Sequence, residues 1–378
     1  RPSAPMRSWV VVSRGFSTVL MSSGFRRTRV RRPCSCASAS AAACSRVTLR
    51  VTWLTVPVFV VRRSPGRSGA PVSAPEARTS RPCRRTTVTN WFGSPAGLRR
   101  VAECTADREP LPSLKRVLSA GAPGPSDVLA AITTRLTGGA QVFTPYGATE
   151  ALPVAVIGSD AVLGETSRAT RDGRGVCVGR VVRETEVRVI AITDDPLPTW
   201  DDVTEVPDGT VGELVVRGPS VTTAYFRRDG ATRAAKIDDG GTTWHRMGDA
   251  GLRDAQGRLW FHGRKSQRVT TAGGVLFADA CEAVFAGVDP VVRRVALVGV
   301  PDGSVETPVL VVECAARADW PAIEATLRAR AASCERTRSI ATILRYDDAL
   351  PVDPRHNAKI RREVVREWAI RELRRGRA

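Results

Sequence analysis

The chain has 378 residues, 42% of them hydrophobic, and a formal net charge of +19. This length can bury a sizeable core and predicts about two or three domains. Residues 1–90 contain 17 Arg and a single acid, Glu76, whereas the rest of the chain is almost neutral. Because the excess charge lies in one segment and not on a patch of a folded domain, the composition argues against nucleic acid as a partner.

The first segment also has an unusual composition. Residues 1–89 contain no Asp, Lys, Gln, Ile, His, Tyr or Asn, and Arg, Ser, Ala, Val and Pro dominate. This mixture is typical of GC-rich DNA translated in the wrong frame, and a disordered basic arm is the alternative. Residues 1–87 are therefore left unassigned, without a site, and are expected to be disordered or poorly packed.

No transmembrane or targeting segment is expected. The apolar run at residues 51–61 is too short to span a bilayer and contains a proline. The nine cysteines are scattered, and no Cys-x-x-Cys occurs. Zinc and disulfide frameworks are therefore not expected, and the sequence favours a reducing, cytoplasmic location.

From residue 88 the pattern predicts a parallel α/β unit. A turn at residues 92–95 leads into a helix with Leu98 and Val101 on its apolar face. A buried strand at 114–123 ends in a glycine turn, a helix begins near Ser126, and a strand at 141–145 leads to a turn at Tyr146. Ligands of such units lie at the carboxyl edge of the strands.

Further along, the pattern changes twice. Short β-rich runs at 186–192, 212–217 and 258–262, separated by Pro, Asp and Gly, predict a small β subdomain. A compact α+β unit follows, with strands at 292–300, 307–314 and 340–346 and a helix at 320–332. In a final helix we expect Ile360, Val364 and Trp368 to form an apolar stripe, with Val365 and Ala369 on its flank. The fold class is thus α/β plus α+β.

The residues suited to chemistry are concentrated in three places. In Tyr146-Gly147-Ala148-Thr149-Glu150, a ring can stack on a purine, a glycine permits close approach, a hydroxyl can bind phosphate and a carboxylate can hold Mg²⁺. Asp249, expected at a turn after a strand, suits ribose hydroxyls, although such an Asp can also bond only its own turn. Arg264 offers a planar fork of donors for ribose or phosphate.

These motifs, together with Gly-Arg-Lys at 263–265 and a lysine near the C-terminus, resemble the adenylate-forming (AMP-binding) superfamily over about residues 88–378. The resemblance implies ATP and Mg²⁺ as cofactors. It assigns an adenine-side turn to Gly121, Ala122 and Pro123, adenine stacking to Tyr146 with Gly147 beside it, phosphate binding to Thr149 and Mg²⁺ to Glu150. It assigns ribose binding to Asp249, a nucleotide contact to Arg264, a hinge to Ser266, and a bridge between the carboxylate and the α-phosphate to Lys359.

The resemblance also implies a domain division. Residues 88–263 correspond to the C-terminal part of the large AMP-binding domain, and residues 264–378 to a small mobile C-terminal lid. The family's Ser/Thr/Gly-rich loop ending in Pro-Lys does not occur in the sequence. We therefore expect a chain that is N-terminally truncated and binds AMP or an acyl-adenylate better than it turns over ATP.

Within the superfamily, the motifs look most like those of the β-lactone synthetases of bacterial long-chain olefin biosynthesis. This implies ATP-dependent closure of a 2-alkyl-3-hydroxy fatty acid to a β-lactone, with other olefin-pathway enzymes as partners. His356, three residues before Lys359, could accept the hydroxyl proton or position the substrate, or could only shape its loop. The alternatives are a long-chain acyl-CoA ligase and an inactive fragment that retains nucleotide or partner binding.

Overall fold

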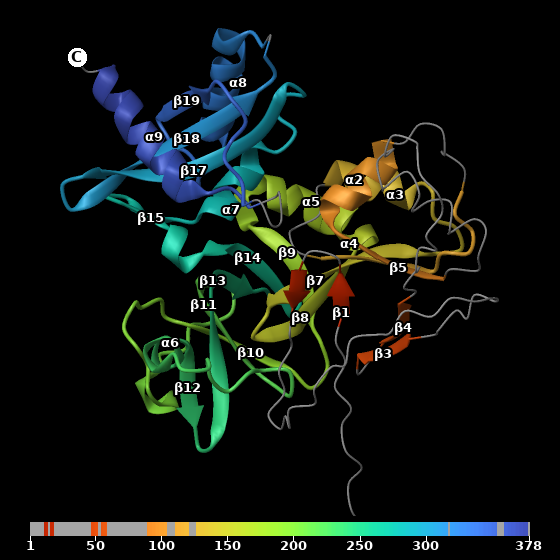
Figure 1. The fold of residues 1–378 in the computed structure, drawn as a ribbon. Helices are drawn as coiled ribbons and strands as arrows, with labels where there is room; N and C mark the ends of the chain where they lie inside the picture. Colours follow the sequence, from red (N-terminus) through yellow and green to blue (C-terminus); the bar gives the residue numbers. More distant parts are fainter. Residues whose placement is uncertain are drawn as a thin grey trace, which may run out of the picture. The chain divides into compact units, whose positions relative to one another are not determined.

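A computed structural model describes residues 11–13, 16–18, 47–51, 54–58, 89–103, 110–120, 126–316, 318–353 and 359–376 (Figure 1). The chain divides into two compact units, residues 1–47 and 48–378. Near the N-terminus, β1 (Val11–Ser13) pairs antiparallel with β2 (Phe16–Thr18), and β3 (Val47–Val51) pairs with β4 (Leu54–Val58). Most of residues 1–87 lie outside the described residues, so their expected lack of packing stays a prediction.

One large mixed sheet dominates the second unit. Its strands follow the order β10-β11-β13-β14-β9-β8-β7-β6-β5, and β12 pairs with β13. The three parallel strands at one end confirm the predicted α/β unit. The strands are β5 (Asn90–Gly93), β6 (Arg116–Ser119), β7 (Gln141–Ala148), β8 (Ala151–Gly158), β9 (Val176–Val181), β10 (Glu186–Ile190), β11 (Gly212–Arg217), β12 (Lys236–Asp239), β13 (Thr242–Arg253) and β14 (Arg258–Arg264).

Helices α2 (Pro95–Glu103) and α3 (Ser126–Thr133) pack on the parallel strands. As predicted, Leu98 and Val101 are buried, and they join Val117 of β6 and Ile132 of α3 in one apolar cluster. Figure 1 shows these two helices gathered with α4 (Ser159–Leu163) and α5 (Glu165–Ala169) beside β5, β7 and β9. The π-helix η2 (Thr170–Arg174) follows α5 in the chain.

The β-rich stretch does not form a sheet of its own. β8 pairs with β7 on one side and with β9 on the other, so the antiparallel strands continue the parallel ones. Trp244 of β13 is buried there and stacks on Trp200, with ring centroids 4.5 Å apart. Short helices border this part of the sheet, namely η3 (Trp200–Asp202) and α6 (Asp229–Ala235).

The C-terminal α+β domain is built as predicted around a three-stranded sheet. Side chains alternate along β17 and β18, so that Leu297 and Leu310 face α8, whereas Val298 and Val309 face α9. α8 connects β18 to the parallel strand β19. The elements are η4 (Lys265–Gln267), β15 (Val269–Thr271), β16 (Gly274–Leu276), α7 (Ala278–Glu282), η5 (Ala283–Phe285), β17 (Val292–Asp302), β18 (Val305–Cys314), α8 (Trp320–Ser333), β19 (Thr342–Tyr346) and α9 (Arg362–Arg375).

The buried stripe of α9 differs from the prediction. Val365 and Ala369, expected on its flank, are fully buried, whereas Val364 and Trp368 are only half-buried. Trp368 instead meets the edge of Tyr346, with ring centroids 4.7 Å apart. Small side chains therefore occupy the line of closest approach, because α9 packs tightly on the sheet, and the large ring lies at its margin.

Three side chains of the C-terminal domain bind consecutive carbonyls of η2. Arg330 Nη2 donates to the carbonyl of Arg171 at 2.6 Å, Cys334 Sγ to that of Asp172 at 3.5 Å, and Arg336 Nε to that of Gly173 at 2.5 Å. We call this set the carbonyl clamp. It attaches the C-terminal domain to the large domain away from residues 264–268, where the chain passes between them.

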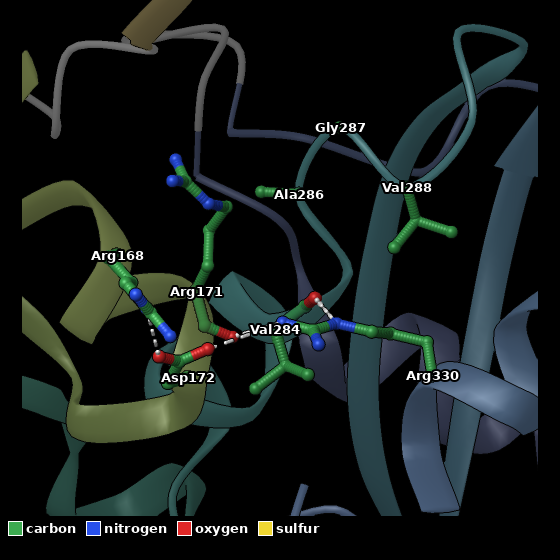
Figure 2. Close-up of a pocket in the computed structure, with 8 residues that line it drawn as sticks. All are labelled: Arg168, Arg171, Asp172, Val284, Ala286, Gly287, Val288 and Arg330. Carbon is green, nitrogen blue, oxygen red and sulfur yellow. Dashed lines mark hydrogen bonds and ion pairs between the residues drawn. The ribbon is translucent and has the colours of Figure 1, made fainter. Parts of the chain in front are cut away.

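A cavity of about 380 Å³ lies beside the clamp. Figure 2 shows Arg330 reaching across it, where its Nε donates to the carbonyl of Val284 and its Nη2 lies 3.9 Å from Asp172. Among the described residues, no helix is long and apolar enough to cross a membrane.

Candidate active site

Three strands bring Tyr146, Asp249 and Arg264 together. Asp249 of β13 and Arg264 of β14 are directly opposed in the antiparallel register. The Tyr146 hydroxyl donates to Asp249 Oδ2 at 2.6 Å. Arg264 Nη1 lies 2.7 Å from Asp249 Oδ1, but its hydrogen bond goes to the carbonyl of Met247 at 3.1 Å. Oδ1 is therefore buried and ion-paired, and it accepts no hydrogen bond from the described residues.

The local structure around these residues differs from the expected turns. Tyr146 lies within β7, which continues to Ala148, and Asp249 lies within the long strand β13. Gly248 has φ 65°, and the register of β13 shifts between Ala250 and Gly251. The positive φ of Gly248 changes the direction of the backbone just before Asp249, so the strand is locally irregular where a turn was expected.

Burial dominates the electrostatics of the pair. Desolvation raises the pKa of Asp249, although the Arg264 charge and the Tyr146 hydroxyl act in the opposite direction. Burial, followed by the Asp249 charge, raises the pKa of Tyr146 well above its usual value. The phenol therefore stays protonated and donates its hydrogen bond to the carboxylate.

A tight turn between β7 and β8 carries Thr149 and Glu150, the residues predicted to bind phosphate and Mg²⁺. Thr149 is exposed at the turn, and Glu150 is half-buried beside it. A side chain at Gly147 would place its Cβ 2.5 Å from the carbonyl oxygen of Ala151. Gly147 is thus required by the close approach of the facing strand, which gives it a structural reason in addition to the proposed contact with a nucleotide.

Two residues next to Glu150 were missed by the sequence analysis. The Tyr225 hydroxyl donates to Glu150 Oε1 at 2.7 Å. The ammonium group of Lys236 donates to the carbonyl of Thr222 and lies 5.8 Å from the centroid of the Tyr225 ring. No local pattern marks either residue, since Glu150 and Tyr225 are 75 positions apart.

These neighbours set the protonation of Glu150. Burial acts to raise the pKa of its carboxyl, but hydrogen bonds from Tyr225 and from its own backbone, with the charges of His245 and Lys236, bring the pKa below its usual value. Burial lowers the pKa of Lys236 to about 8 and that of His245 to about 4. Near neutral pH Glu150 is thus ionised and His245 is neutral.

A buried ion-pair network around Glu213 includes Lys265, the neighbour of Arg264 in the chain. Oε2 of Glu213 accepts from Arg246 Nη2 at 2.6 Å and Nε at 3.2 Å, and from Lys265 Nζ at 3.1 Å. The side chains of Glu213 and Arg246 are only 1% and 3% exposed. Lys265 begins η4, and the exposed Ser266 follows it, so the network holds the chain immediately before the proposed hinge.

Lys359 is exposed, and its charge acts on Asp249 by lowering the pKa of that carboxyl. The backbone amide of Asp353 donates to the Lys359 carbonyl at 2.8 Å. Gly121, Ala122, Pro123 and His356 lie outside the described residues, so their roles stay predictions.

A cavity of about 340 Å³ lies between Glu150 and the ion-pair network around Glu213. Its walls include Glu150, Tyr225, His245, Arg264 and Lys265. Within the described ranges, no group of three or more His, Cys, Asp or Glu side chains could hold a metal by itself. A Mg²⁺ ion shared between one carboxylate and substrate phosphates fits this arrangement, because Mg²⁺ commonly binds in that way.

The comparisons with known proteins agree with this geometry. Residues 65–226 match the family of AMP-binding enzymes, beginning inside the segment left unassigned above. The chain is 48% identical to the olefin β-lactone synthetase of Stenotrophomonas maltophilia over 309 residues, which is 80% of this chain and 55% of that protein. It spans about half the length of the relatives it matches.

Solved structures show the same fold. An amide bond synthetase from Marinactinospora thermotolerans matches with a TM-score of 0.62 and 28% identity, covering 78% of this chain and 54% of that one. The o-succinylbenzoate coenzyme A synthetase of Bacillus subtilis, solved with ATP and a magnesium ion, matches with a TM-score of 0.59 and 20% identity, covering 76% and 53%. The chain belongs to the AMP-binding, adenylate-forming enzymes, and its sequence is similar to that of an olefin β-lactone synthetase.

Proposed function

We propose that this chain is part of an enzyme that activates a carboxylic acid with ATP and closes a 2-alkyl-3-hydroxy fatty acid to a β-lactone. The buried Asp249 carboxylate carries the proposal, since it lies between Tyr146 and Arg264 and its Oδ1 has no hydrogen-bond donor among the described residues. The 48% identity to the olefin β-lactone synthetase supports the choice of product. A cytoplasmic location and partners from the olefin pathway belong to the same proposal.

In the adenylation step, Asp249 would accept hydrogen bonds from the ribose while Tyr146 holds the carboxylate in place. Arg264 and Thr149 would contact the phosphate side, and the Lys359 charge would neutralise the negative charge that develops during transfer. Glu150 would hold Mg²⁺, which neutralises phosphate charge and orients the leaving pyrophosphate. Rotation at Ser266 would bring the lid over the adenylate.

Ring closure needs no second substrate. The β-hydroxyl oxygen of the acyl-adenylate forms a bond to the activated carbonyl carbon, the bond from that carbon to the phosphate oxygen breaks, AMP leaves, and the hydroxyl proton passes to a base. Because both groups belong to one molecule, the reaction avoids the entropy loss of a bimolecular encounter. We assign the proton-accepting or positioning role to His356.

The test is to incubate the protein with ATP, Mg²⁺ and a 2-alkyl-3-hydroxy acid, with and without CoA, and to identify products by mass. A product lighter than the acid by one water, formed equally in both, supports the β-lactone synthetase. A CoA thioester as the sole product would instead show an acyl-CoA ligase. AMP binding without any product would indicate a chain that retains only the nucleotide site.

A further inference from the structure

The segment from Thr222 to Tyr225 has no regular secondary structure, yet it is fastened to the turn that carries Glu150. The backbone amide of Thr222 donates to the Glu150 carbonyl at 2.8 Å. Three residues later, the Tyr225 hydroxyl donates to the Glu150 carboxylate at 2.7 Å. One short segment thus binds both the main chain and the side chain of the same acid, which fixes the side chain relative to its own backbone. We call residues 222–225 the strap.

Two further contacts hold the strap. Lys236, at the start of β12, donates from Nζ to the Thr222 carbonyl and, at 3.2 Å, to Thr222 Oγ1. The backbone amide of Tyr225 donates to Thr232 Oγ1 at 3.0 Å. Lys236 is only 8% exposed, so its ammonium group has little water to compete for these bonds. Both ends of the strap are therefore anchored to the region that begins the long hairpin β12–β13.

We propose that Tyr225 and Lys236 are positioning residues that hold the Glu150 carboxylate ready for a divalent cation, Tyr225 directly and Lys236 through Thr222. The inference rests on the proposed function, in which Glu150 is the cation ligand. A carboxylate offers about four acceptor positions, and among the described side chains only Tyr225 donates to this one. Its own backbone amide supplies another hydrogen bond, and Glu150 lines the cavity of about 340 Å³.

The chemistry favours this role over simple packing. A tyrosine hydroxyl fixes the orientation of a carboxylate without removing its charge, so the carboxylate remains able to bind a cation. Partners of this kind orient metal ligands, and their loss typically lowers metal affinity by about 10- to 100-fold. Phe226, the next residue, is 85% exposed and has no group that can donate to a carboxylate, so it provides a matched aromatic control.

The experiment measures binding of Mn²⁺, used as the probe for the cation site, by electron paramagnetic resonance in the presence of saturating AMP. We expect Tyr225→Phe to raise the Kd for Mn²⁺ about 10-fold or more. Lys236→Met should act in the same direction, Lys236→Arg should retain most of the affinity, and Phe226→Leu should leave it unchanged. Thermal melting of each variant separates a loss of folding from a loss of metal affinity.

Two further measurements are made: Mn²⁺ binding by Glu150→Gln, and AMP binding by the unaltered protein without metal. Together they separate a failure of the proposed function from a failure of the positioning role. If the protein does not bind AMP, the proposed function fails. If AMP binds and Glu150→Gln weakens Mn²⁺ binding while Tyr225→Phe does not, the positioning role is overturned. If Glu150→Gln has no effect, or if Mn²⁺ does not bind beside AMP, Glu150 is not a cation ligand and the inference falls with nucleotide binding intact.

Discussion

Replacing Glu213 by alanine should destabilise the folded protein by about 3 kcal/mol. Removing one partner of a buried ion pair typically costs about 3–5 kcal/mol, because the other charge remains buried without compensation. Here Arg246 keeps hydrogen bonds to the carbonyls of Thr193 and Asp195, at 2.6 and 2.7 Å, and Lys265 keeps one to Thr193 at 2.7 Å. These retained acceptors place the expected loss at the lower end of the range.

Urea unfolding followed by tryptophan fluorescence is a suitable assay, since Trp244 and Trp200 stack in the same part of the sheet. The control is Glu205→Ala, because Glu205 is 46% exposed and its ion pair with Arg188 is 3.8 Å long. An exposed pair of this kind contributes about 0–1 kcal/mol. If Glu213→Ala and Glu205→Ala lost the same free energy of unfolding, the network would not be the stabilising element described above.

Three further outcomes are expected. Asp249→Asn should raise the Kd for AMP about 10- to 100-fold, from the roughly 1.5–3 kcal/mol of a hydrogen bond to a charged group; an unchanged Kd by calorimetry would exclude Asp249 from the nucleotide site. Burial and the Arg336 charge lower the pKa of His262 to about 3. Because an unfolded His titrates with a pKa of about 6.5, the neutral buried ring contributes fully to the free energy of unfolding above that pH. Below it, the folded protein loses about 1.4 kcal/mol of stability per pH unit. Unfolding measured between pH 6 and 4 should depend less on pH in His262→Gln, and equal slopes would count against the effect. Arg336→Ala should accelerate proteolysis at residues 264–268 while the exposed control Arg338→Ala does not, and equal cleavage rates would show that the clamp does not restrain the C-terminal domain.

The grouping of Tyr146, Asp249 and Arg264 could be anticipated from sequence because each residue lies within a short motif. Tyr146, Asp249 and Arg264 were each chosen from local chemistry, and the strand register brings all three together. The turns expected around Tyr146 and Asp249 were wrong in detail, since both residues lie in strands. Strand extent depends on pairing between distant segments, which a single sequence does not reveal.

The support around Glu150 could not be predicted in this way. Tyr225 and Lys236 belong to no motif, and Tyr225 lies 75 positions from the Glu150 carboxylate that it binds. The prediction of the central residues of the α9 stripe was wrong for a related reason. Periodicity identifies the apolar face of a helix, but the distance between helix and sheet decides that Ala369 and not Trp368 lies at the centre of that face.

The carbonyl clamp also affects how the residues before 264 would behave without the C-terminal α+β domain. The last carbonyls of a helix have no partner inside that helix, and those of Arg171, Asp172 and Gly173 are bound by side chains that lie more than 150 positions later in the chain. In a protein ending before residue 264, these three carbonyls could hydrogen-bond only to water. Gly173 would also be uncovered, since a Cβ placed on it would now lie 3.0 Å from Cys334 Sγ. The end of η2 is therefore completed by the C-terminal domain, and we expect this last turn to fray in a protein that lacks that domain.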